Sequence, residues 1–89
     1  MNLEVLATKA ADVMMRGAVQ FLRSKGIASE SVDLDALVVE LRSRSAPALD
    51  VALRDAKDAL AAGMDRVAEA TFVSTMALAG MEAAKAVVR

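Results

Sequence analysis

Apolar residues recur along the chain at helical spacing, so the sequence predicts an all-helical protein. Over residues 2–25, side chains such as Leu6 and Phe21 fall on one stripe, every three or four positions, and charged residues fall on the opposite stripe. This period is typical of an α-helix with one buried face. Asn2 is a favourable N-cap and Gly26 a favourable C-terminal cap, which places the two ends of a first helix.

A second helix is predicted over residues 33–44, after a loop at residues 27–32. Its apolar positions again recur every three or four residues, with acidic residues at its start and arginines at its end. The only proline, Pro47, lies just beyond it. Because the residue before a proline avoids helical geometry and proline suits the first turn of a helix, we expect a break at residues 43–47. A third helix over residues 47–62 follows.

The apolar pattern then continues to the C-terminus. From Leu53 the steps alternate between three and four residues, and many side chains on this seam are small. Gly63 is typical of a helix end, so we favour a break or kink near this residue. One continuous helix is the alternative, since glycine inside a helix costs only about 1 kcal/mol relative to alanine.

The size and composition of the chain favour a single domain over residues 1–89. We expect an up-and-down bundle of three or four helices with the C-terminal helix at its centre. A domain of this size buries only about 60 to 65% of the surface of its unfolded chain, so its stability is marginal. Cysteine and histidine are absent, which removes disulfides and nearly all transition-metal sites as sources of stability. Homodimerisation is therefore expected to complete the bundle.

Twelve consecutive residues without a charge, residues 70–81, form the most unusual segment of the chain. A helix that is apolar nearly all round needs cover on several sides. The small residues of the segment could let the last helix pack closely against the first helix of the same chain. Alternatively, a second copy covers it in a two-fold dimer with the last helices antiparallel, or another protein does so. The predicted interface residues are Phe72, Val73, Ser74, Met76, Ala77, Gly80 and Met81.

The charge of the chain gives no sign of a nucleic-acid or membrane partner. Its net charge is −1, with 11 basic and 12 acidic residues, so no strong field steers it toward an anionic surface. The alternative function is a nucleic-acid-binding regulator that uses the two helices around the predicted turn, with Arg42, Arg44 and Arg54 as contacts. Acidic residues on the later helix oppose this alternative.

Few side chains in this sequence can carry chemistry. His, Cys and Tyr are absent, and these residues supply most groups whose protonation or nucleophilicity is tuned near neutral pH. The carboxylates of residues 50–69 alternate with basic residues, which is typical of a solvated face of local ion pairs. We therefore expect no catalytic residue, cofactor, metal or small-molecule substrate.

The leading functional interpretation is a non-catalytic helical interaction protein that self-associates. It would serve as an accessory subunit, an adaptor or a small regulator. A nucleic-acid-binding regulator is the second interpretation. An enzyme, or a metal-binding protein with a Mg²⁺ site on the carboxylates of residues 50–69, is the third.

The sequence predicts a cytoplasmic protein. Charges at Glu4, Lys9, Asp12 and Arg16 interrupt any export-signal core near the N-terminus. As a helix, the uncharged segment would span about 18 Å, well short of the roughly 30 Å of a bilayer core. We expect no membrane-spanning helix.

Overall fold

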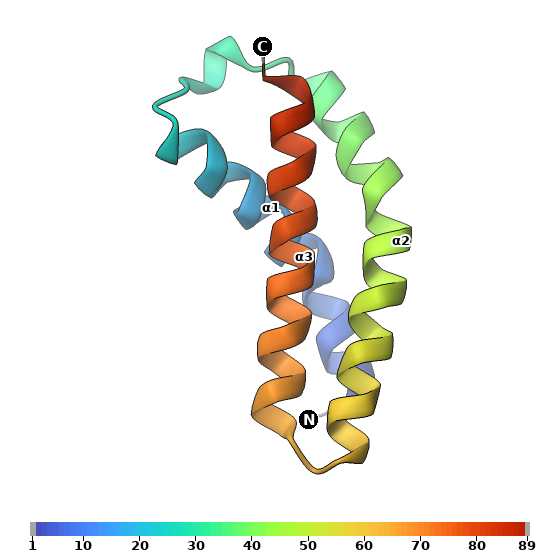
Figure 1. Ribbon diagram of the computed structural model, residues 1–89. Helices are drawn as coiled ribbons and strands as arrows, with labels where there is room; N and C mark the ends of the chain where they lie inside the picture. The colour runs from blue at the N-terminus through green and yellow to red at the C-terminus, as the bar shows by residue number, and fades with distance from the viewer. Residues whose placement is uncertain (1, 89) are drawn as a thin grey trace.

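The computed structural model describes residues 2–88, which fold into three α-helices. These are α1 (Leu3–Ser24), α2 (Leu34–Ala61) and α3 (Asp65–Val87). A one-turn 3₁₀ helix, Ser29–Ser31, lies in the connection between α1 and α2. The helices run up, down and up, with α2 and α3 side by side (Figure 1). The described residues contain no strand, so the predicted all-α class is confirmed.

Side chains cap the first turns of α1 and α2. The Asn2 side-chain oxygen accepts the Val5 backbone N–H at 2.9 Å. The Asp33 carboxylate accepts the Ala36 backbone N–H at 3.1 Å. Each bond satisfies one of the donors that the start of a helix leaves unpaired. The predicted helix starts at Asn2 and near Asp33 are confirmed.

Glycine ends α1 and α2 in the same way. Gly26 has φ +67° and Gly63 has φ +75°, the left-handed conformation that favours glycine. After α2, the Gly63 N–H donates to the Leu60 carbonyl, and the Met64 N–H donates to the Ala59 carbonyl. These are the two bonds of a Schellman motif, which closes a helix end. The predicted break near Gly63 is therefore confirmed.

The predicted break at residues 43–47 is wrong, because α2 continues through Pro47 as a single helix. A proline inside a helix leaves one carbonyl without an N–H partner and costs about 3 kcal/mol. Both halves of α2 nevertheless pack against α3. Leu37, before the proline, and Ala52, after it, are each buried in a cluster that includes residues of α3. This shared packing holds the two halves in one helix, which curves along its length (Figure 1).

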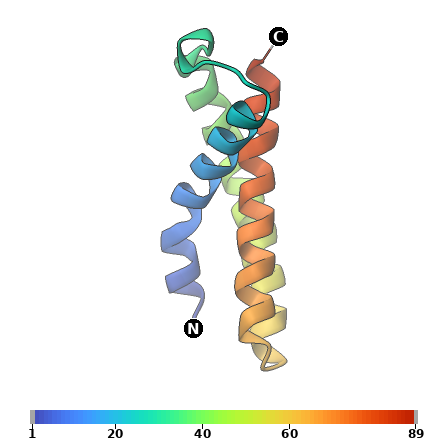
Figure 2. The same cartoon turned by 90° about the vertical axis from the view of Figure 1, so that its left-hand side faces the viewer.

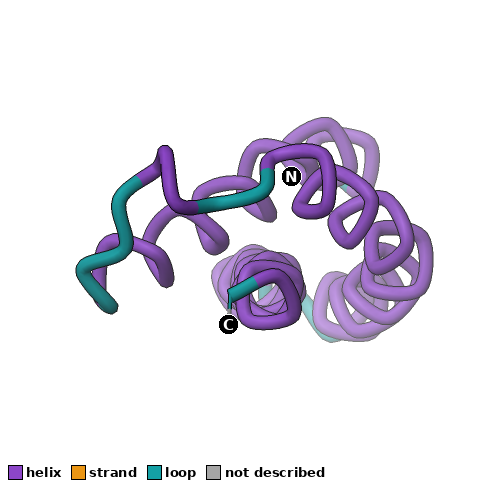
Figure 3. Tube along the Cα trace, turned by 90° about the horizontal axis from the view of Figure 1, so that it is seen from above, coloured by secondary structure: helices purple, strands orange, loops and turns teal. Residues whose placement is uncertain are grey.

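The C-terminal helix α3 lies at the centre of the bundle, as predicted. It packs against both α1 and α2, whereas α1 and α2 contact each other much less. Figure 3 shows α3 nearly end-on, with α1 and α2 on adjacent sides of it. The opposite side of α3 is covered by no other element of residues 2–88.

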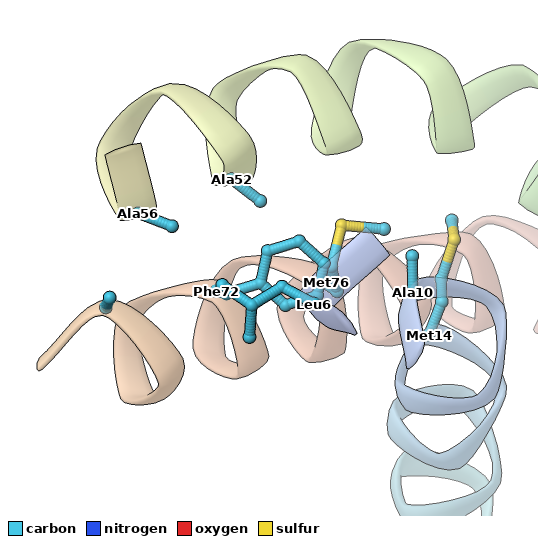
Figure 4. Close-up of a cluster of buried hydrophobic side chains, with 8 residues drawn as sticks. Leu6, Ala10, Met14, Ala52, Ala56, Phe72 and Met76 are labelled. Carbon is cyan, nitrogen blue, oxygen red and sulfur yellow. The ribbon is translucent and has the colours of Figure 1, made fainter. Parts of the chain in front are cut away.

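The main hydrophobic core lies between all three helices, around the ring of Phe72 (Figure 4). Leu6 from α1 and Met76 from α3 lie beside this ring, and all three side chains are fully buried. From α2, the buried Ala52 and Ala56 belong to this cluster, and partly buried leucines such as Leu49 and Leu53 pack against it. Small side chains that face a large ring fill the space between helices closely. A second, smaller cluster holds Ala18, Val32, Leu37, Ala83 and Ala84.

Two glycines let the backbones of α1 and α3 touch where these helices cross. A Cβ on Gly17 would lie 2.9 Å from the Ala77 Cα, and a Cβ on Gly80 would lie 2.8 Å from the Met14 carbonyl carbon. Real Cβ atoms essentially never come this close to a neighbour. Figure 2 shows that the C-terminal half of α1 lies closer to α3 than the N-terminal end of α1 does. The close packing of the last helix on the first therefore occurs within one chain.

Replacing Phe72 with alanine should destabilise the fold by roughly 3–5 kcal/mol, because it removes a fully buried ring and leaves a cavity. Urea denaturation followed by circular dichroism measures this change. Val39→Ala is the control, since Val39 is 63% exposed. Its truncation should change the free energy of unfolding by less than about 0.5 kcal/mol. Equal effects of the two substitutions would contradict the place of Phe72 in the core.

Replacing Gly80 with alanine should destabilise the protein by about 1–3 kcal/mol, because the added methyl group would push α1 and α3 apart. The direction of the change in stability is informative, because alanine forms helices better than glycine and would otherwise stabilise α3. Thermal unfolding measures the change, with the exposed α1 residue Gln20 as the control site for an alanine substitution. A Gly80→Ala variant as stable as the original protein would show that the two backbones do not touch.

Replacing Pro47 with alanine should stabilise the protein, by up to about 3 kcal/mol, because alanine restores the missing helical N–H donor. At a turn followed by a new helix, proline would suit its position, and alanine would leave the stability unchanged or lower it. The change in Tm therefore tests the continuity of α2. A lowered Tm would contradict a continuous α2 and support the predicted break at residues 43–47.

Candidate functional site

The residues predicted as an interface divide between two sides of α3. Phe72 and Met76 are fully buried, and Gly80 is covered by the backbone of α1. The structure places these three residues inside the core of the single chain. Their burial comes from α1 and α2, so it requires no second copy.

The side of α3 turned away from α1 and α2 forms the surface of interest, which we call the outward face. Ser74 is exposed at its middle and Met81 is half-buried near its end. Val73 and Ala77, also half-buried, flank it beside α1. Four of the seven predicted interface residues therefore lie on this face or at its edge. The outward face consists of Val67, Ala70, Thr71, Ser74, Leu78 and Met81.

Sequence reasoning missed Val67 and Leu78, which are 45% and 54% exposed. The apolar character of α3 extends nearly all round the helix, so its pattern does not mark which side packs inward. Only the positions of α1 and α2 decide this. The spacing of uncharged residues could have indicated this face. They recur every three or four positions along one side of the helix, at Val67, Thr71, Ser74 and Leu78.

The outward face carries no charge over its whole length. From Val67 to Met81 it extends about 21 Å at 1.5 Å per residue. Glu69 is the one charged residue within this span, and helical spacing puts it on a different side of α3. Solvent-facing sides of helices are normally polar or charged. An uncharged surface of this length is a candidate contact surface.

A shallow groove borders the outward face on each side. One groove lies between α1 and α3, and its lining includes Val19 and Val73. The other lies between α2 and α3, and its lining includes Pro47 and Leu78. Both linings also hold charged side chains, among them Arg16 in the first groove and Glu82 in the second, so the uncharged surface ends at the grooves.

The three arginines of the nucleic-acid alternative lie along one helix, α2. Arg44 pairs with Glu40 at 3.0 Å, and Arg54 pairs with Asp50 at 2.8 Å. Arg42 is exposed. Because α2 runs without a turn through Pro47, no separate recognition helix is formed. The predicted helix–turn–helix geometry is wrong, for the same reason as the predicted break.

Charged side chains of the described residues lie at the surface. None is buried, and no three carboxylates among residues 2–88 come close enough to hold a metal ion. The local pairs include Asp12 with Arg16 at 3.0 Å and Glu82 with Lys85 at 3.5 Å. Within the same residues, no helix has both the length and the apolar character to cross a bilayer.

Comparison with known proteins gives no relative. No protein family matches the chain, and no curated protein or solved structure is significantly similar to it. A proposal about function therefore has to rest on the surface that the three helices present.

Proposed function

We propose that this protein is a non-catalytic helical interaction protein that self-associates. The observation that carries the proposal is the uncharged outward face of α3, which lies beside a core already filled by the chain itself. Val67 and Leu78 keep about half of their surface exposed on this face. Covering the exposed half of such a side chain contributes roughly 1 kcal/mol, so burial of this face would favour association.

The other helices also expose apolar side chains, and Leu34 and Val39 at the start of α2 are each 63% exposed, near Asp35 and Glu40. On α1, the exposed side chains of Met15 and Val19 lie near the exposed ion pair of Asp12 and Arg16. Removing charges from water without new partners opposes binding there. On α2, Val51 adjoins Asp50, which pairs with Arg54. On α3, the residues of the outward face are all uncharged over about four helical turns.

Self-association also suits a chain of this size. With 89 residues and no cysteine, the protein has a small core and no disulfide to add stability. Burial of a further apolar face by a second copy supplies what the single chain lacks. A protein that acts through such contacts would serve as an accessory subunit, an adaptor or a small regulator. The absence of cysteine suits the reducing cytoplasm.

Sedimentation equilibrium at micromolar concentration should give twice the chain mass of 9.3 kDa. The mass should fall toward that of one chain on dilution. The Tm should rise with protein concentration, because only the folded state associates. A mass of 9.3 kDa at every concentration, with a constant Tm, would overturn the proposal.

A further inference from the structure

We infer that residues 27–46 open as a unit from the C-terminal end of α3, while the rest of the three helices stays folded. We call these residues the hinged segment. It holds the 3₁₀ helix and the first part of α2, up to Ala46. Gly26 and Pro47 adjoin its two ends and are the points about which the chain would turn. The movement occurs within one chain, so the inference does not depend on the proposed self-association.

Pro47 is the weak point of α2. Proline has no backbone N–H, so the Ser43 carbonyl, four residues earlier, lacks its helical donor. The residue before a proline also avoids helical geometry, which weakens the helix at Ala46. No side chain of residues 42–47 is buried, so packing at this level does little to replace the missing bond. A turn of the chain here breaks fewer hydrogen bonds than a turn elsewhere in α2.

The other end of the hinged segment borders open space. A Cβ on Gly26 would meet no atom within 4 Å beyond its chain neighbours. A groove of about 930 Å³ extends from here between the connection, the first turns of α2 and the end of α3. Its lining includes Ile27, Val39 and Val87. Packing between the hinged segment and the last turn of α3 is therefore incomplete.

Few buried side chains attach the hinged segment to its neighbours. Among its described side chains, Val32 and Leu37 are the buried ones, both in the second cluster. Ile27 and Leu41 are partly buried against the same cluster. Three further large apolar side chains are exposed instead: Leu34, Val38 and Val39. Regions with few buried apolar contacts are those that open locally, before the whole protein unfolds.

The main core lies outside the hinged segment. The buried residues of the cluster around Phe72 come from α1, from α3 and from the part of α2 after Pro47. Leu6 and Met76, which lie beside this ring, are fully buried. Leu41 packs partly against this cluster as well as the second one, so it links the two. Opening would break that link and leave the main core and the crossing of α1 with α3 intact.

Opening would expose apolar side chains that the closed bundle hides. Ala83 of α3 is fully buried in the second cluster, which also holds Leu37 of the hinged segment. Both would become accessible to solvent in the open state. The C-terminal end of α3 would thus alternate between hidden and accessible apolar surface, whereas the surroundings of Phe72 would stay closed.

Native-state amide hydrogen exchange of the full chain tests the opening. After correction for intrinsic rates, amides of residues 40–44 should exchange at least about 10-fold faster than those of residues 52–60. Their exchange should also respond less to urea, because a local opening exposes less surface than global unfolding. Equal protection and equal urea dependence in the two parts of α2 would overturn the inference.

The substitution Pro47→Ala separates opening about Pro47 from simple fraying at the start of α2. It should slow the exchange of residues 40–44 at least about 10-fold, because opening would then also break the restored helical bond. Arg42→Ala, at an exposed position of the same segment, is the control and should leave these rates unchanged. Unchanged exchange of residues 40–44 in Pro47→Ala would show fraying that stops before the proline, and would overturn the inference.

A matched pair of cysteine variants gives a second measurement, because the chain has no cysteine of its own. Ala83 and Ala52 are both fully buried, the first in the second cluster and the second in the main core. With a colorimetric disulfide reagent in excess, the thiol of Ala83→Cys should react at least about 10-fold faster than that of Ala52→Cys, since reaction requires exposure by opening. Circular dichroism verifies that both variants are folded. Equal rates would overturn the inference.

Discussion

The contact between the backbones of α1 and α3 is the constraint on which the rest of the structure depends. At Gly17 and Gly80 no side chain separates the two helices, so each backbone packs directly against the other. Close contact of this kind gains dispersion energy from many atoms at once. It also fixes where α1 can lie, because a shift along or around α3 would drive a Cβ atom into a carbonyl group.

The arrangement of the core follows from this crossing. Near its N-terminus α1 also reaches α2, and there Leu6, Phe72 and Met76 form the filled centre of the bundle. Toward its C-terminus α1 follows α3, and the small residues Ala18 and Ala84 meet beside the connection to α2. With α1 and α2 each taking one side of α3, the third side of this helix stays exposed (Figure 3).

Local signals in the sequence predict most of the fold. Asn2, Asp33 and Gly63 act within one turn of the chain, so their effects as caps can be derived from residue type. Pro47 misleads because its local cost is offset by contacts of α2 with α3, and these depend on residues far away in the sequence. The position of the candidate surface is harder to predict from the sequence than the fold is. An apolar helix such as α3 shows that cover is needed but not on which side, and the outward position of Leu78 depends on where α1 crosses.

The composition of α3 differs between its two sides. Its inward side brings Phe72 and Met76 into the core, while its outward side, with Val67 and Leu78, is left without charges that would resist burial. Only three large side chains of the described residues are fully buried, so we expect a small free energy of unfolding for the single chain. Association through the outward face would hold α3 from both sides. Such association would link pairing to folding, because a change that loosens α3 would weaken both contacts together.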